Sequence, residues 1–106
     1  MHARIVTFTL DGLSPDDYRA TAAAIAESFN DWPGLVFKIW LGDTDRNRYG
    51  GMYLFESSAD ADRSRGTPEF AALEANPHFA ELDIRELPVL DEPTAVTAAV
   101  LRAHVG

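Results

Sequence analysis

The chain has 106 residues, a formal net charge of −8 and no cysteine, with 46% hydrophobic and 25% charged residues. This length fits one domain spanning residues 1–106, and the composition is that of a folded globular protein. The 17 acidic residues outnumber the 9 basic ones, which argues against binding to nucleic acid or to an anionic membrane. Without cysteine there are no disulfides, thiolate metal sites or cysteine nucleophiles.

No segment has the pattern of a targeting or membrane-spanning sequence. The N-terminal residues lack the apolar run of a signal peptide, and no later apolar run reaches the length of a membrane span. We therefore expect a soluble cytoplasmic protein.

The first part of the chain predicts a strand followed by a helix. Apolar residues alternate along residues 4–10, the period of a strand. Ser14 is a candidate N-cap and Pro15 suits the first helical position, so a helix is expected to run from there to about Asn30. Trp32-Pro33-Gly34 then ends it.

Two further strands, at about 35–41 and 49–56, form a predicted hairpin around a polar loop. Since side chains alternate along a strand, Lys38 shares one face of the first strand with Val36 and Trp40. The other face carries Leu35, Phe37, Ile39 and Leu41. Because both faces are apolar, the hairpin needs cover on both sides.

The C-terminal half predicts a broken helix, a strand and a last helix. Residues 57–76 read as two helical pieces interrupted at Gly66. A strand is expected at about 82–90. The helix that begins near Asp91 carries an apolar stripe, made of Val96, Ala99, Val100 and Ala103.

The order of elements is β-α-β-β-α-β with an additional C-terminal helix. Right-handed connections make the ferredoxin-like α+β fold the expected one. That fold covers one sheet face with helices and leaves the other bare. The apolar residues on both faces of strand 35–41 therefore predict a homodimer packed sheet to sheet. The terminal helix, residues 91–106, is a candidate arm across the partner.

Four segments, taken together and in this order, resemble the YdhR-like monooxygenase family. They are Pro33-Gly-Leu-Val-Phe-Lys-Ile-Trp40, Gly50-Gly-Met-Tyr-Leu-Phe55, Ala75-Asn-Pro-His-Phe79 and Val89-Leu-Asp-Glu-Pro93. This family belongs to the wider dimeric α/β-barrel group, which includes the cofactor-free antibiotic biosynthesis monooxygenases and small polyketide cyclases. The resemblance covers essentially the whole chain and implies a homodimeric α/β barrel.

The resemblance also implies a kind of chemistry. The cofactor-free oxygenases of the wider group use no redox centre, because an electron-rich substrate reduces dioxygen itself. The resemblance thus implies a hydrophobic aromatic or polyketide-type substrate, a setting in secondary metabolism and no cofactor. The protein would supply a dry pocket, an aromatic wall and a group that stabilises negative charge.

Three residues of the hairpin are candidates for such a site. Lys38 can pair with an enolate or phenolate oxygen; Trp40 and Tyr53 can stack on a planar substrate, and Tyr53 can also donate a hydrogen bond. The alternatives are a Lys38 that snorkels to a rim or pairs with Glu56, and aromatic residues that belong to a dimer core. We assign Lys38 and Tyr53 as catalytic and Trp40 as substrate-binding.

His78 is a further catalytic candidate, since it is the histidine away from the termini and can carry a proton near neutral pH. The alternative is a capping or surface histidine. Phe8, Phe55 and Glu56 complete the expected substrate-binding set. His2, His78 and His104 are too scattered to form a metal motif, so no metal site is expected.

The expected function is therefore cofactor-independent oxygenation of a hydrophobic small molecule. Two other functions remain open on the sequence alone. One is a polyketide cyclase or isomerase that uses the same pocket without oxygen, and the other is a non-catalytic module that binds a small ligand.

Overall fold

The computed structural model describes residues 1–99 and contains a four-stranded antiparallel sheet. The strand order is β2-β3-β1-β4, which is the ferredoxin-like arrangement. The α+β, ferredoxin-like prediction is confirmed. In chain order the elements are β1 His2–Leu10, α1 Pro15–Ile25, the 3-10 helix η1 Ala26–Asp31, β2 Leu35–Asp43, β3 Arg48–Phe55, α2 Ser58–Ser64, α3 Pro68–Ala75, β4 Phe79–Pro88 and α4 Asp91–Thr97.

The first helix starts as the sequence predicts and ends differently. Ser14 caps it by accepting a hydrogen bond from the amide of Asp17 at 3.1 Å, with Pro15 in the first turn. The α-helix stops at Ile25, and the chain continues as η1. Ser28 Oγ donates to the carbonyl of Ile25 at 2.6 Å, a side-chain bond that competes with regular helix geometry.

Strand β4 begins three residues earlier than predicted, at Phe79. Glu81 has a positive φ of 53°, and the pairing with β1 shifts register between Thr7 and Thr9. This bulge brings both Phe79 and Leu82 against the core, although they are an odd number of residues apart. The bulge therefore explains why apolar and polar residues alternate imperfectly along this strand.

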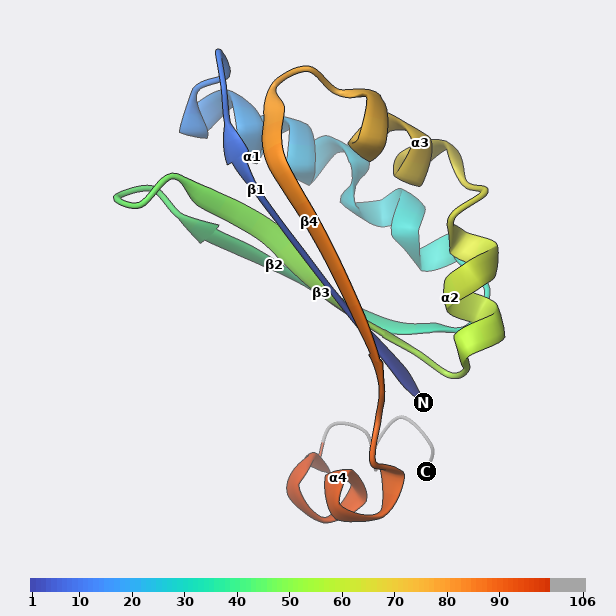
Figure 1. Cartoon of the computed structure of the whole chain (residues 1–106). Helices are drawn as coiled ribbons and strands as arrows, with labels where there is room; N and C mark the ends of the chain where they lie inside the picture. Colours follow the sequence, from blue (N-terminus) through green and yellow to red (C-terminus); the bar gives the residue numbers. More distant parts are fainter. Residues whose placement is uncertain (100–106) are drawn as a thin grey trace.

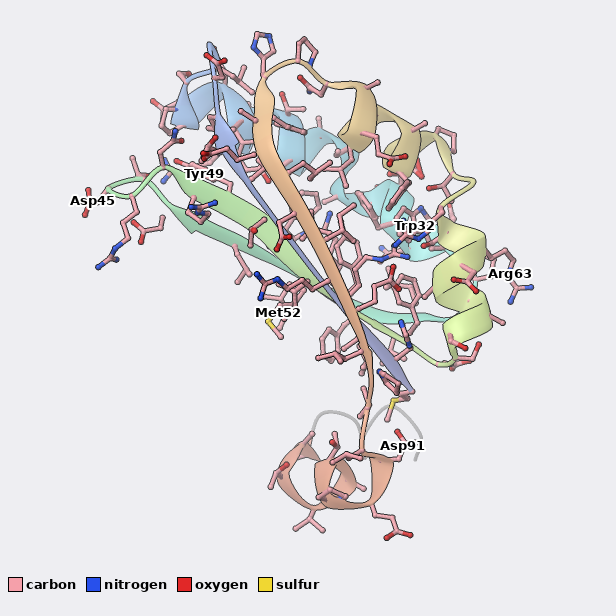
Figure 2. All side chains as sticks on the ribbon, viewed as in Figure 1. Trp32, Asp45, Tyr49, Met52, Arg63 and Asp91 are labelled. Carbon is pink, nitrogen blue, oxygen red and sulfur yellow. The ribbon has the colours of Figure 1, made fainter. Side chains whose placement is uncertain are left out.

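The helices α1, α2 and α3 all lie on one face of the sheet, here called the covered face (Figure 1). The hydrophobic core lies between these helices and the sheet. Figure 2 shows Trp32 on this helical side. The buried residues of this core are Val6, Phe8, Tyr18, Phe29, Trp32, Tyr49, Tyr53, Phe55 and Ala61.

No described helix packs on the opposite face, here called the bare face (Figure 1). Ile39, Met52 and Ile5 are register partners across β2, β3 and β1, and they remain 47%, 39% and 42% exposed. Figure 2 shows Met52 pointing away from the helices. Both faces of β2 are thus apolar, as its alternation predicts.

Helix α4 lies beyond the end of β4, apart from the sheet and the other helices (Figure 1). Leu90 and Val96 are 77% and 76% exposed. The N-terminal amine of Met1 pairs with Asp91 at 2.9 Å and so joins the start of α4 to β1. Val100 and Ala103 of the predicted apolar stripe lie outside the described residues. Within residues 1–99, no helix has both the length and the apolar character needed to cross a membrane.

Candidate functional site

A cavity of about 490 Å³ lies between the covered face and the helices α1, η1 and α3. Its walls are mainly aromatic, with Phe8, Tyr18, Phe29, Trp32, Trp40, Tyr53, Phe70 and Phe79 among the lining residues. Thr21 and Ala24 of α1 and Ala72 of α3 line the cavity and are also exposed. Its mouth therefore lies between α1 and α3.

One transverse row of the covered face carries most of the polar chemistry. Lys38 of β2 pairs in register with Tyr53 of β3, Tyr53 pairs with Arg4 of β1, and Arg4 pairs with Glu86 of β4. Two cations thus lie in the same row, one on each side of Tyr53. The edge strand β2 contributes the cation that reaches the cavity.

The ammonium of Lys38 is surrounded by aromatic rings. Its Nζ lies 3.4 Å from the ring centroid of Trp40, 3.7 Å from that of Phe29 and 4.7 Å from that of Tyr53. Among residues 1–99, no carboxylate forms an ion pair with it. Burial lowers the pKa of Lys38 from 10.5 to about 7. Near neutral pH this side chain is therefore present in both protonation states.

Gly51, which pairs in register with Trp40, makes room for the side chain of Lys38. A Cβ at Gly51 would stand 3.1 Å from Cε of Lys38 and 3.4 Å from Cε1 of Tyr53. Gly50 next to it has a φ of +156°, and a Cβ there would lie 1.8 Å from the carbonyl oxygen of Val6. The Gly50-Gly51 pair thus allows close strand packing and leaves space at the cavity floor.

Tyr53 forms the floor beside Lys38. Its ring stacks against Trp32 at 5.9 Å and Phe55 at 6.2 Å between centroids. Burial raises its pKa above the ordinary value, so it remains a neutral hydroxyl. Trp40 and Phe8 line the same cavity, and Phe8 stacks on Phe79 at 4.3 Å.

Arg4 is the other cation of the row, and each of its guanidinium nitrogens lies within 3.3 Å of an oxygen atom. Nη1 donates to Oγ of Ser64 and Nη2 to the carbonyl of Ala61, each at 2.8 Å. Nε lies 3.3 Å from Oε2 of Glu86 without the alignment of a hydrogen bond. The guanidinium also lies 5.0 Å from the ring centroid of Phe55. Arg4 therefore joins β1 to α2 and β4.

Glu86 holds the outer end of this row. It contacts His2 at 3.0 Å and forms an ion pair with Arg65. Burial raises the pKa of Glu86, but the hydrogen bond from Arg65 and the charge of Arg4 outweigh it and hold the pKa below its usual value. The carboxylate therefore stays charged and anchors both arginines.

Three expected site residues lie outside the lining of the cavity. Phe55 is fully buried beneath Arg4, on the covered face but away from the open space. Glu56 follows the end of β3, where its amide donates to the carbonyl of Gly34 at 2.8 Å. Nδ1 of His78 lies 2.8 Å from the carbonyl oxygen of Asp11, and this contact joins the start of β4 to the end of β1.

Several lining residues were not among the sequence candidates. They come from the helical layer and from β4, namely Tyr18, Phe29, Trp32, Glu69 and Phe79. Glu69 accepts a hydrogen bond from Nε1 of Trp32 at 2.8 Å, which fixes the indole at the wall. The aromatic stripe of residues 18–29 is the signal that points to the first two.

No cluster of three or more His, Cys, Asp or Glu side chains suited to a metal ion occurs within residues 1–99. The three histidines are separated in the sequence, and His104 lies outside the described residues. His2 contacts Glu86 and His78 contacts Asp11, at opposite ends of β1.

Solved structures show which class of fold this is. Rv0793 of Mycobacterium tuberculosis aligns with a TM-score of 0.69 at 19% identity, covering 86% of this chain and 96% of that one. SnoaB of Streptomyces nogalater, a cofactor-independent oxygenase, aligns with a TM-score of 0.65 at 21% identity, covering 85% and 93%. The heme-degrader MhuD of M. tuberculosis aligns with a TM-score of 0.67 at 19% identity, covering 85% and 96%.

The fold is therefore shared with oxygenases and heme-degrading proteins. The family follows from the sequence: the model described as "Putative mono-oxygenase ydhR" matches residues 5–100. The chain belongs to this family, and the resemblance noted in the sequence is confirmed. No curated protein matches the chain.

Proposed function

We propose that this protein is a small cofactor-independent monooxygenase-like enzyme that acts on a hydrophobic aromatic or polyketide-type substrate in secondary metabolism. One observation carries the proposal: an aromatic cavity of about 490 Å³ holds a single amine, Lys38, with no carboxylate paired to it among the described residues. Membership of the ydhR family and the shared fold with SnoaB support it.

In this proposal Lys38 provides both the base and the counter-charge. With a pKa of about 7, its neutral amine accepts a proton from an acidic phenol, enol or anthrone carbon. The ammonium that forms then pairs with the substrate anion in a site of low polarity. An anthrone-type anion gives electrons to dioxygen, one oxygen atom becomes a new carbonyl and the other leaves as water.

The neighbouring side chains position the substrate. The hydroxyl of neutral Tyr53 donates a hydrogen bond to the substrate oxygen, and the rings of Trp40 and Phe8 hold a planar substrate by stacking. The roles predicted for His78, Phe55 and Glu56 stay predictions, and the mechanism proposed here does not use them.

The haem binding named for MhuD is not part of the proposal. Within residues 1–99 the cavity lining contains no His, Cys or Met, which are common axial ligands of haem iron. Tyr18 does line the cavity, but burial, with a smaller effect from Tyr49, raises its pKa to about 12 and disfavours a phenolate ligand.

The active form in this proposal is a homodimer. The bare face presents Ile5, Ile39, Leu41 and Met52, each at least 37% exposed, and such an apolar patch is the usual mark of an interface. Asp83 and Arg85 of β4, paired at 2.9 Å, lie at the side of this patch. A second copy of the same sheet matches both its apolar centre and its charged side.

Oxygen uptake with anthrone as substrate tests the reaction. The wild-type protein should consume one dioxygen for each anthraquinone formed, and Lys38→Met should lower kcat/KM by roughly 100-fold because the charge partner of the anion is lost. Arg46→Met, which removes an 84% exposed cation at the hairpin tip, is the matched control and should not change the rate.

The outcomes separate the candidate functions. Conversion of a polyketide-type substrate without oxygen uptake would replace the oxygenase with a cyclase or isomerase. Tight binding of anthrone without any conversion would replace it with a binding module. Unchanged kinetics in Lys38→Met would remove Lys38 from the mechanism.

Light scattering tests the homodimer. Wild type should have twice the mass of the chain, whereas Ile39→Glu should give single chains that remain folded, since the interface would bury a carboxylate on each copy. Deletion of residues 91–106 tests the arm: an unchanged dimer affinity would show that α4 does not cross the partner. A monomeric wild type would refute the dimer.

A further inference from the structure

The cationic group in the cavity differs chemically from every other basic side chain of the protein. The chain contains nine basic residues, of which Lys38 is the single lysine and the other eight are arginines. A guanidinium stays protonated in proteins and is no nucleophile, whereas an amine can lose its proton and form covalent bonds. The one side-chain amine of the protein therefore lies in its aromatic cavity.

The surroundings of this amine suit a nucleophile. Its neighbours are the faces of Trp40, Phe29 and Tyr53, which neither take its proton nor hold it in an ion pair. Gly51 leaves space beside its Cε, so the end of the side chain has room to move. Desolvated lysines of this kind form Schiff bases in other enzymes.

We propose that Lys38 condenses with the carbonyl group of an apolar aromatic aldehyde or ketone and holds it as an imine. The neutral amine attacks the carbonyl carbon and forms a carbinolamine, which then loses water. Nζ gives up both of its hydrogens, the carbonyl oxygen leaves in the water, and a carbon–nitrogen double bond remains. The step is a dehydration and needs no oxidant or reductant.

The site also suits the protonated imine. An iminium is a cation, and the rings that surround Nζ stabilise a cation by their π faces. The hydroxyl of Tyr53, which lines the same cavity, can donate a hydrogen bond to the departing oxygen of the carbinolamine. A second hollow of about 290 Å³ is bordered by Lys38, Glu27 and Asn30 and offers the released water a polar exit between η1 and β2.

Few other titratable groups face this amine. Tyr18 of α1, Tyr53 of β3 and Glu69 of α3 line the cavity, and Glu27 of η1 borders the second hollow. Glu69 is engaged by Trp32 at 2.8 Å. The pKa of Lys38, lowered to about 7 by burial, supplies free amine at neutral pH.

Reductive trapping of the full chain with 2-naphthaldehyde and sodium cyanoborohydride at pH 7 tests the proposal. Intact mass and peptide mapping should find an adduct on Lys38 whose mass gain equals the aldehyde minus one oxygen atom. Its rate should exceed that of Nα-acetyl-lysine by on the order of 1000-fold, because each unit of lowered pKa gives about tenfold more free amine and the pKa of Lys38 is lowered from 10.5 to about 7. The rate should rise to a plateau just above pH 7.

The N-terminal amine serves as an internal reference. Met1 pairs with Asp91 at the far end of the sheet, and peptide mapping separates its adduct from that of Lys38. Lys38→Arg keeps the positive charge and should lose the cavity adduct. Adding Arg46→Lys to that variant moves the single lysine to the exposed hairpin tip, where it should label at the rate of Nα-acetyl-lysine.

The selectivity of wild type provides a test that depends on no variant. 2-Naphthaldehyde should label Lys38 faster than a sulfonated naphthaldehyde, because the aromatic cavity disfavours a permanent anion. Labelling confined to Met1, or labelling of Lys38 no faster than that of Nα-acetyl-lysine, would refute the imine. The proposal goes beyond oxygenation: loss of oxygen uptake together with trapped imine would refute only the oxygenase, and the reverse result would refute only the imine.

Discussion

Arg4 and Lys38 lie in one row of the same sheet face, and their surroundings differ sharply. Arg4 is 1% exposed and has an oxygen partner for each of its nitrogens within 3.3 Å, in Ser64, Ala61 and Glu86. Lys38 borders a cavity, and its ammonium lies over three aromatic rings without an ion pair to a carboxylate among the described residues. Tyr53 separates the two.

This contrast shows how a fold divides the work between two buried cations. A cation with all its partners in place holds elements together, because moving it would leave charges unpaired. A cation without a carboxylate destabilises the folded state and is retained where a ligand or a reaction uses it. We therefore interpret Arg4 as structural and Lys38 as functional.

The largest expected effect is the loss of stability when Arg4 is replaced. Arg4→Met should lower the free energy of unfolding by about 3 kcal/mol, since it leaves Glu86 with less compensating charge. Lys38→Met, a similar change of shape, should leave stability unchanged or raise it by up to about 1 kcal/mol. Urea unfolding measures both variants. Equal losses in the two would contradict the division of roles.

The pH dependence of the free energy of unfolding also distinguishes Lys38 from Arg4. In the folded protein Lys38 has a pKa of about 7, whereas an ordinary lysine has a pKa of 10.5, so between these values the unfolded chain binds more protons. Stability should therefore rise with pH across this window, by at most about 1.4 kcal/mol per unit, and stay flat below it. Subtracting the stability curve of Lys38→Met from that of wild type separates the contribution of Lys38 from that of the buried tyrosines, whose pKa values are also shifted. A flat difference curve would show an unperturbed lysine.

A smaller effect is expected from crowding Lys38. In Gly51→Ala the new methyl group would stand 3.1 Å from Cε of Lys38 and 3.2 Å from the carbonyl oxygen of Ile39. We expect a loss of about 1 kcal/mol in stability and a slower reaction of the displaced amine with 2-naphthaldehyde. Gly66→Ala is the control, because its methyl group would approach nothing closer than 3.6 Å.

The smallest expected effect on stability is at Tyr53, between the two cations. Its hydroxyl has no hydrogen-bond partner in the part of the chain that the structure describes, so Tyr53→Phe should change the unfolding free energy by less than about 0.5 kcal/mol. Oxygen uptake should nevertheless fall by about tenfold, one hydrogen bond to the substrate being lost. Tyr49→Phe, which loses a hydrogen bond of 3.1 Å to Thr44, should lower stability and leave oxygen uptake unchanged.

The sequence predicts the sheet well and the site only in part. Regular alternation along β2 places Lys38 and Trp40 on one face, and the order of elements leaves the ferredoxin-like topology. Which face the helices cover does not follow from that alternation, because both faces of β2 are apolar. The cavity between Lys38 and the residues of α1 and η1 could therefore not be predicted from the sequence, and only the structure shows it.

Arg4 and His78 show why other contacts of the side chains could not be predicted from the sequence. The partners of Arg4 are Ala61, Ser64 and Glu86, at least 57 residues away, and no local period encodes such contacts. His78 follows Asn76-Pro77, in the loop between α3 and β4. Its ring contacts the carbonyl of Asp11, which follows β1. A loop between elements carries no period from which the direction of its side chains can be predicted.

Both tryptophans of the chain, Trp32 and Trp40, line the cavity. The indole of Trp32 is fixed by Glu69, and that of Trp40 lies against the amine of Lys38. Tryptophan fluorescence therefore reports from the cavity. An aromatic guest will quench it on entry, so that binding, exchange and release can be followed optically in the unlabelled protein.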